Sequence, residues 1–316
     1  MEARFLNLKN KVCQSRHVKA GIGFAKRRLP KWLWVLIRLT FLVGLSFVVL
    51  YPVLISLSVA FRSPEDITDP AVLWIPKNFT LLNITETLKF MNYWKSLGNS
   101  FKIGIISSLL QVVSCALVGY GFARFRFKFK GLFFSMVIFT IIVPPQVVFV
   151  PTYLMYRDFH MLDTPAVMWL PALLGVGIRS GLFIYIFRQF YRNLPKELED
   201  AALVDGCGAY KTYFKIIIPC AKPAFLTVFL FSVVWYWNDY YNTVMYFTNT
   251  QTVTTALARL SAAMLSADPN GVIKDVYLMS ARNQAACLLT LLPMLLIYIV
   301  FHRFFTEGVE RTGIVG

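Results

Sequence analysis

Charge is scarce in this sequence, and acidic charge is the scarcest. Only 15% of the 316 residues are charged, against about a quarter in a soluble domain, and 57% are hydrophobic. The 16 acidic residues face 32 lysines and arginines. This composition disfavours a soluble enzyme, a disordered chain and a disulfide-rich secreted scaffold. Because the basic residues flank apolar stretches, we expect them to meet membrane lipid and not nucleic acid.

Signatures of chemistry are also missing. The dipeptide Gly-Lys never occurs, so no phosphate-binding loop is present, and neither is a His-Glu-x-x-His or a Gly-x-Ser-x-Gly motif. The five cysteines lack Cys-x-x-Cys spacing, which excludes the usual zinc sites. We therefore expect no enzyme activity, no metal and no cofactor bound by this chain.

What the sequence has in abundance is long uncharged apolar runs. A helix needs about 20 mostly apolar residues to cross a bilayer. The sequence predicts an all-α, polytopic membrane protein with six transmembrane helices, at Leu39–Phe61, Ile103–Ala123, Gly131–Tyr156, Thr164–Phe187, Pro223–Asn238 and Asn283–His302. The fifth run is the weakest, and we expect it to continue past Asp239 to Tyr246.

Lysine and arginine predict the orientation of these helices. Residues 1–31 carry nine bases and one acid, and residues 124–130 carry four bases and no acid. Residues 62–99 carry four of each, and residues 157–163 one base and two acids. Because basic segments stay in the cytoplasm, the first two are expected inside and the last two outside. Alternation assigns the rest: 188–222 inside, 248–282 outside, and both termini cytoplasmic.

Two parts of the chain are therefore expected: a basic cytoplasmic arm at 1–31 and a six-helix membrane domain at 32–316. The arm could bind anionic lipid headgroups. A solvated topology anchor is the simpler interpretation.

The inside segment after the fourth run is the most informative. Pro195 precedes three acids, which is typical of a helix start, and Gly206 is typical of a helix end. A second short helix at Ala209–Ile218 is expected to end at Pro219. With Ala201 and Ala202 at the surface, the two helices would form a knob suited to a groove on another protein. An ordinary amphipathic loop is the alternative.

This segment resembles the cytoplasmic coupling loop of binding-protein-dependent ABC import permeases. The family pattern is Glu-Ala-Ala, three residues, Gly, nine residues, then Ile-x-Leu-Pro. Here Asp200-Ala201-Ala202 is followed at the same spacing by Gly206 and by Ile216-Ile217-Ile218-Pro219. Asp200 stands in place of Glu and Ile218 in place of Leu. The shorter carboxylate would weaken an ionic contact with the partner.

The wider chain, from about residue 32 to the end, resembles the MalG-type carbohydrate permeases. Three features carry this resemblance: Trp237-Asn238-Asp239, the final span Gln284–His302, and a tail that ends Thr312-Gly313-Ile314-Val315-Gly316.

The resemblance implies a fold, a function and partners. The chain would have the ABC importer permease fold and lie in the cell membrane of a prokaryote. Its coupling loop, 191–220, would dock on a cytoplasmic ATPase dimer that binds ATP and Mg²⁺. It would pair with a second homologous permease and receive sugars or oligosaccharides from an extracytoplasmic binding protein. The expected coupling residues are Asp200, Ala201, Ala202, Asp205, Gly206, Ile216 and Pro219. The alternative is a secondary active transporter, but the inverted repeats and midplane ion ligands it needs are not seen.

Candidate pathway residues cluster in the fifth run. Aromatic faces pack on sugar rings, while amides and carboxylates bind hydroxyl groups, and an Asp within a span is a functional hypothesis by default. The candidates are Trp235, Trp237, Asn238, Asp239 and Asn242. The competing interpretation is an interfacial aromatic belt with Asp239 near the headgroups.

Three further features are open to two interpretations each. Arg179, in the fourth run, either pairs with Asp239 or a carbonyl, or meets an acidic sugar. Pro144, Pro145 and Pro151 make the third run either an irregular, cavity-lining segment or a kinked helix. In the outer segment 248–282, a helix is expected at Thr254–Leu265. By the resemblance, this segment reaches toward the binding protein, and a simple docking surface would look the same.

Overall fold

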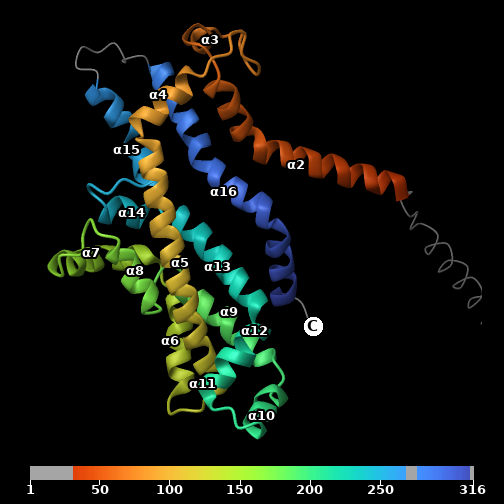
Figure 1. Ribbon diagram of the computed structural model, residues 1–316. Coiled ribbons are helices and arrows are strands. Elements are labelled where there is room, and N and C mark those ends of the chain that lie inside the picture. The colour runs from red at the N-terminus through yellow and green to blue at the C-terminus, as the bar shows by residue number, and fades with distance from the viewer. Residues whose placement is uncertain (1–30, 268–275, 314–316) are drawn as a thin grey trace, which may run out of the picture. The chain divides into compact units, whose positions relative to one another are not determined.

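The computed structural model describes residues 31–267 and 276–313 (Figure 1). Apart from one isolated bridge between Arg62 and Phe79, the regular structure of these residues is helical. The all-α fold class is thereby confirmed. The chain divides into two compact units, 1–55 and 56–316, which are described separately.

The first unit contains most of helix α2 (Lys31–Ala60), whose segment Trp32–Ala60 is long and apolar enough to cross a membrane. This confirms the first predicted span as a helix and extends it toward the N-terminus. The predicted basic arm lies outside the described residues apart from Lys31, so its role stays a prediction.

In the second unit, two predicted spans are single long helices. Helix α5 (Tyr93–Arg124) and the segment Val276–His302 of α16 (Val276–Gly313) both satisfy the length and hydropathy of a span. Two bent pairs add further candidates: α6 (Lys130–Ile142) with Pro145–Asp158, and Ala209–Cys220 with α13 (Lys222–Trp237). By length and composition, the described residues therefore hold three to five spans, and the predicted count of six remains unconfirmed.

The third predicted span is broken at Pro144 and Pro145, whereas Pro151 lies inside the helix that follows. Helix α6 is followed by the 3₁₀ turn η1 (Pro145–Val148) and by α7 (Phe149–Asp158), with a bend of 99° at the break. Proline has no N–H to continue the helical ladder, and it restricts the residue before it. The interpretation of this run as an irregular segment is confirmed.

The fourth predicted span is not one helix, which corrects the sequence-based expectation. Helices α8 (Ala166–Leu173) and α9 (Ser180–Asn193) are separated by residues 174–179. The N–H groups of Gly175 and Val176 donate to the carbonyls of Ala172 and Pro171, which closes the end of α8. An uncharged run measures hydrophobicity, and it carries no information on whether the backbone ladder is continuous.

Helices α5 and α9 pack closely at the centre of the second unit. A Cβ added at Gly119 would lie 2.6 Å from the Cβ of Phe187, so only glycine lets the backbones approach this far. Phe183, Phe187 and Tyr191 of α9 are fully buried in the same cluster, together with residues of α5 and α13.

Segments assigned to one side of the membrane by their charge lie together. Asn99 donates to the carbonyl of Gln251 at 2.9 Å, and Ser100 accepts from the N–H of Val253 at 2.8 Å. At the other end of α5, Arg124 donates to the carbonyl of Leu194 at 2.8 Å. Figure 1 shows α4 (Leu82–Phe90) and α15 (Val253–Ala267) at one end of α5, and α10 (Glu197–Val204) at the other. Which end faces the cytoplasm stays a prediction.

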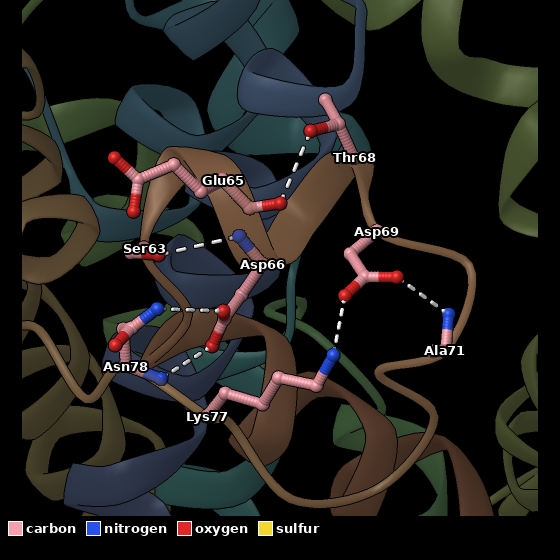
Figure 2. Close-up of polar contacts among 8 residues, drawn as sticks. All are labelled: Ser63, Glu65, Asp66, Thr68, Asp69, Ala71, Lys77 and Asn78. Atoms are coloured by element: carbon pink, nitrogen blue, oxygen red, sulfur yellow. Dashed lines mark hydrogen bonds and ion pairs between the residues drawn. The ribbon is translucent and has the colours of Figure 1, made fainter.

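The predicted outer segment 62–80 is ordered by its own polar groups, as Figure 2 shows. The Ser63 hydroxyl accepts from the N–H of Asp66 and caps the short helix α3 (Pro64–Thr68). The Asp66 carboxylate accepts from both nitrogens of Asn78, at 2.7 and 3.2 Å. The hydrogen bond from Lys77 lowers the pKa of Asp69. Asp66 and Asp69 of this segment therefore have local structural partners.

Candidate functional site

The predicted coupling loop contains two short helical segments. Helix α10 starts after Pro195, two residues later than expected, and ends at Val204. The second segment comprises α11 (Ala209–Thr212), the π-helical turn η2 (Tyr213–Ile217) and α12 (Ile218–Cys220).

The expectation that Pro219 ends this second segment is wrong. Pro219 lies in the first turn of α12, where a missing N–H is tolerated, and the π-helical turn before it changes the hydrogen-bond register. The break comes at Ala221, where the chain bends by 75° into α13.

Gly206 lies in the turn where the chain changes direction between the two helical segments. Its φ is +73°, a left-handed conformation that a side chain disfavours, and no atom lies within 4 Å of an added Cβ. The N–H of Gly206 donates to Leu203, and that of Cys207 to Ala202, which is a Schellman motif. The requirement for glycine here is therefore conformational and not a matter of space.

The loop is attached to α5 at one place. The guanidinium of Arg124 lies 2.9 Å from the carboxylate of Glu199, and it also donates to the carbonyl of Leu194. The hydroxyl of Tyr120 donates to Glu199 at 3.4 Å. The rings of Tyr120, Tyr191 and Tyr213 pack against one another beside this pair.

The sequence analysis missed Glu199 and Arg124. Arg124 was only one of four bases in the 124–130 loop. A one-dimensional pattern carries no signal that pairs it with an acid 75 positions later.

The loop exposes large apolar side chains among charged ones. Val204 is 88% exposed and Tyr210 85% exposed, and Leu203 and Phe214 are also exposed. Of the predicted coupling residues, Asp200, Ala201, Asp205, Gly206 and Pro219 are exposed, while Ile216 is half-buried. Ala202 is only 1% exposed, which corrects its expected place at the surface. It lies four residues after the half-buried Leu198, on the helix face that turns inward.

A cavity of about 890 Å³ is formed by the broken third and fourth runs and the end of α13. Pro144, Pro145 and Phe149 line one part of it, and the segment 175–182 lines another. The interpretation of the third run as cavity-lining is thus confirmed. Of the predicted pathway residues, Arg179, Trp235 and Asn242 line the cavity.

The other three predicted pathway residues lie elsewhere. Trp237, the last residue of α13, is buried in a cluster with Val253 and Leu260, and its indole N–H donates to the carbonyl of Thr290. Asn238 is exposed and donates to the carbonyl of Val234.

Asp239 follows in the break between α13 and α14 (Tyr241–Tyr246). One of its carboxylate oxygens accepts from the side-chain amide of Asn242 at 3.0 Å. Asp239 therefore fixes the start of α14 and orients Asn242, which does line the cavity.

Arg179 does not form the expected pair with Asp239. Its guanidinium lies over the ring of Trp235, 4.5 Å from the centroid. Among the described residues it makes no ion pair with an acid.

The outer segment contains the expected helix as α15 (Val253–Ala267). The residues Asp268–Gly271, which would follow it, lie outside the described residues.

The sequence matches the family described as binding-protein-dependent transport system inner membrane component over residues 115–310, more than half of the chain. The chain belongs to this family. It is thus a membrane component of an ABC importer and not an enzyme. This confirms the family resemblance of the coupling loop and the expectation that the chain has no catalytic activity of its own.

Several curated proteins are similar over most of their length. The arabinooligosaccharides transport system permease protein AraQ of Halalkalibacterium halodurans is 26% identical, over 86% of this chain and 93% of that protein. The melibiose/raffinose/stachyose import permease protein MelC of Bacillus subtilis is 28% identical, over 77% and 84%. The sn-glycerol-3-phosphate transport system permease protein UgpE of Escherichia coli is 26% identical, over 88% and 96%.

A solved structure shares the fold. It is a chain of a bacterial ABC transporter involved in the import of the acidic polysaccharide alginate, with a TM-score of 0.74 and 19% sequence identity. The match covers 88% of this chain and 98% of that chain. The predicted ABC importer permease fold is therefore confirmed.

Proposed function

We propose that this chain is one of two transmembrane subunits of an ATP-driven importer of sugars or oligosaccharides. The names of the relatives AraQ and MelC, which specify oligosaccharides, support the substrate class. ATP and Mg²⁺ would bind a separate ATPase dimer. An extracytoplasmic binding protein would deliver the substrate, and a second permease would complete the pathway.

The observation that carries this proposal is the group of large apolar side chains exposed on α10 and α11, displayed on an anchored base. Exposed large apolar side chains on a hydrophilic loop are typical of an interface with another protein. Arg124 and Glu199 attach this part of the loop to the end of α5, and α12 joins it to α13. Movement of a docked ATPase would therefore reach two helices of the membrane domain.

The mechanism is a population shift between two access states. ATP binds more tightly to the closed ATPase dimer, so it favours whichever permease state fits that dimer. The coupling loops would approach each other as the dimer closes, and the helices would switch the cavity from inward-facing to outward-facing. This chain would contribute gating and a substrate pathway and no chemical step.

Trp235 and Asn242 suit a saccharide pathway. Trp235 offers an apolar ring face to a sugar, and the amide of Asn242, oriented by Asp239, offers hydrogen bonds to hydroxyl groups. Both line the cavity between the broken runs.

The test is Val204→Asp in the complete transporter, reconstituted in proteoliposomes with its partner subunits. We expect normal membrane insertion but loss of ATP-driven uptake, because a desolvated carboxylate would oppose docking. Ile75→Asp is the matched control, since Ile75 is 81% exposed in the segment predicted to lie outside. Unchanged uptake by Val204→Asp would contradict the docking role.

A further inference from the structure

The cavity contains one full charge. Among the residues that line it, Arg179 is the one ionisable at neutral pH, and the polar remainder consists of hydroxyl and amide side chains such as Thr140, Thr152 and Asn242. Arg179 lies in the break between α8 and α9, is exposed in the single chain, and brings its charge to a cavity whose lining is otherwise uncharged. An arginine without a counter-ion in such a cavity therefore requires an explanation.

Arg179 is held in a conformation that local preference disfavours. Its φ is +60°, in the left-handed region, which is unfavourable for a residue with a side chain. Such a conformation persists only where the surrounding structure fixes it, and it is common at ligand sites.

The neighbours of Arg179 are fixed by a buried side chain of α5. The amide nitrogen of Gln111 donates to the carbonyl of Ile178, and also to the hydroxyl of Ser180 at 3.2 Å. Gln111 is fully buried. The thiol of Cys115, one turn further along α5, donates to the carbonyl of Ser180 at 3.7 Å. The residues on both sides of Arg179 are thus tied to the central helix.

The guanidinium is positioned but not satisfied. It lies over the Trp235 ring, and the electron-rich face of an indole attracts a cation. Within the described part of the chain, its N–H groups donate to no acceptor. The acid expected to pair with it, Asp239, binds the amide of Asn242 instead. Five N–H donors in a fork match a carboxylate or a phosphate.

We propose that Arg179 binds an anionic group of the transported saccharide, a carboxylate or a phosphate, and so makes the pathway selective for acidic sugars. This inference rests on the proposed function and adds the substrate class to it. Trp235 holds the guanidinium in place, and the hydroxyl and amide groups of the cavity bind the neutral part of the ligand.

The test is equilibrium binding by calorimetry to the purified permease–ATPase complex. The binding protein is left out, so that its own specificity does not contribute. The probes are trigalacturonate, its neutral counterpart galactotriose, and galactose 1-phosphate. The variants are Arg179→Gln and Arg179→Lys. Arg157→Gln is the control, because it removes one positive charge at an exposed surface pair with Asp158, away from the cavity.

We expect the wild type to bind at least one anionic probe about tenfold or more tightly than galactotriose. Arg179→Gln should remove this difference by weakening binding of the anionic probe more than binding of galactotriose. Arg179→Lys should restore part of it, because the charge remains without the fork. Whichever anionic probe is preferred identifies the group as carboxylate or phosphate.

Equal wild-type affinity for charged and neutral probes would overturn the inference, and this comparison does not depend on how any variant folds. An equal loss of both by Arg179→Gln would show a structural role, for example at the boundary with the second permease. If no saccharide binds and none is taken up by the complete transporter, the proposed function itself fails.

Discussion

Helix α5 holds a neighbouring segment at each of its ends, but in different ways. At its C-terminal end, Arg124 holds the coupling loop through Glu199 and Leu194. At its N-terminal end, Asn99 and Ser100 hold residues 251–253 through two neutral hydrogen bonds.

The attachment at the N-terminal end of α5, the end predicted to lie outside, has further support away from α5. Asp163 accepts from the backbone of Asn249 and Thr250, and Arg259 donates to the carbonyls of Phe247 and Thr248. The loop predicted to lie inside has one charged pair with α5, beside an apolar cluster that buries Tyr213 and Ile217. The polar contacts are therefore concentrated in one charged pair at the end predicted to lie inside, and distributed over several hydrogen bonds at the end predicted to lie outside. Single substitutions should therefore affect the two ends unequally.

The largest effect is expected from Arg124→Ala. The Arg124 side chain is 7% exposed and that of Glu199 20%, so the substitution leaves a largely buried carboxylate without its partner. We expect a local cost of roughly 3 kcal/mol and severe loss of ATP-driven uptake. Hydrogen exchange over residues 194–208 should rise, and uptake should be measured in the same preparation.

Lys77→Ala is the matched control at the outer end, where Lys77 and Asp69 form an exposed pair. It should change neither hydrogen exchange over 194–208 nor uptake. An Arg124→Ala variant that behaves like this control would show that the inner attachment is as distributed as the outer one.

Gly206→Ala should have the next largest effect. Its positive φ would cost an alanine about 1–2 kcal/mol, which would distort the turn between α10 and α11. We expect uptake to fall severalfold while ATP hydrolysis continues, and the ratio of substrate moved to ATP hydrolysed measures this uncoupling.

Gly208→Ala provides the control for Gly206→Ala. Gly208 has φ −70° and open space around an added Cβ, so alanine fits there without strain. Equal coupling ratios for the two variants would contradict a conformational role for Gly206.

A smaller effect is expected from Ser100→Ala at the outer end. The substitution removes one acceptor from the N–H of Val253, at a cost of about 1 kcal/mol. Because Asn99 and Asp163 still hold the segment, exchange should rise at Val253 alone and uptake should stay near the wild-type rate. Release of the whole 248–253 segment would mean that the outer attachment is concentrated after all.

The smallest effect concerns pH and Asp163. Burial raises the pKa of this carboxyl, but hydrogen bonds from Thr250 and Asn249 outweigh burial, so the pKa lies below its usual value of 3.8. The stabilisation is therefore complete above pH 3.8 and is lost as the pH falls through the lower, folded value. Solvent around this site keeps the effect small.

Exchange of the Thr250 amide, corrected for the intrinsic rate, measures this effect of acid. It should increase below about pH 4 in the wild type. In Asp163→Asn it should be raised at neutral pH and show no such step. A step of the same size in both proteins would assign the acid sensitivity to another group.

Much of the fold followed from local sequence. The uncharged runs predicted α2, α5 and α16 as long helices, because hydrophobicity over about 20 residues is a local property. Proline predicted the break near Pro144, since it removes an N–H wherever it stands. The break between α8 and α9 was not predicted, because their residues are as apolar as those of a continuous span.

For the candidate site, too, the local sequence predicted some features and missed others. Spacing alone predicted the coupling loop, since Asp200-Ala201-Ala202, Gly206 and Pro219 lie within one short segment. Composition alone gave a cluster of aromatic and polar residues near the end of α13. It did not separate Trp235, which lines the cavity, from Trp237, which packs against Val253.

The sequence by itself determined that this is an all-α membrane protein, that it belongs to the ABC import permeases, and which segment has the spacing of a coupling loop. These depend on hydrophobicity, charge bias and spacing, which are read within a few tens of residues. Only the tertiary structure decided that Arg124 holds Glu199 and that Arg179 lies over Trp235 in a cavity without a counter-charge. Those contacts join residues more than fifty positions apart, and they depend on how helices pack, which no local pattern records.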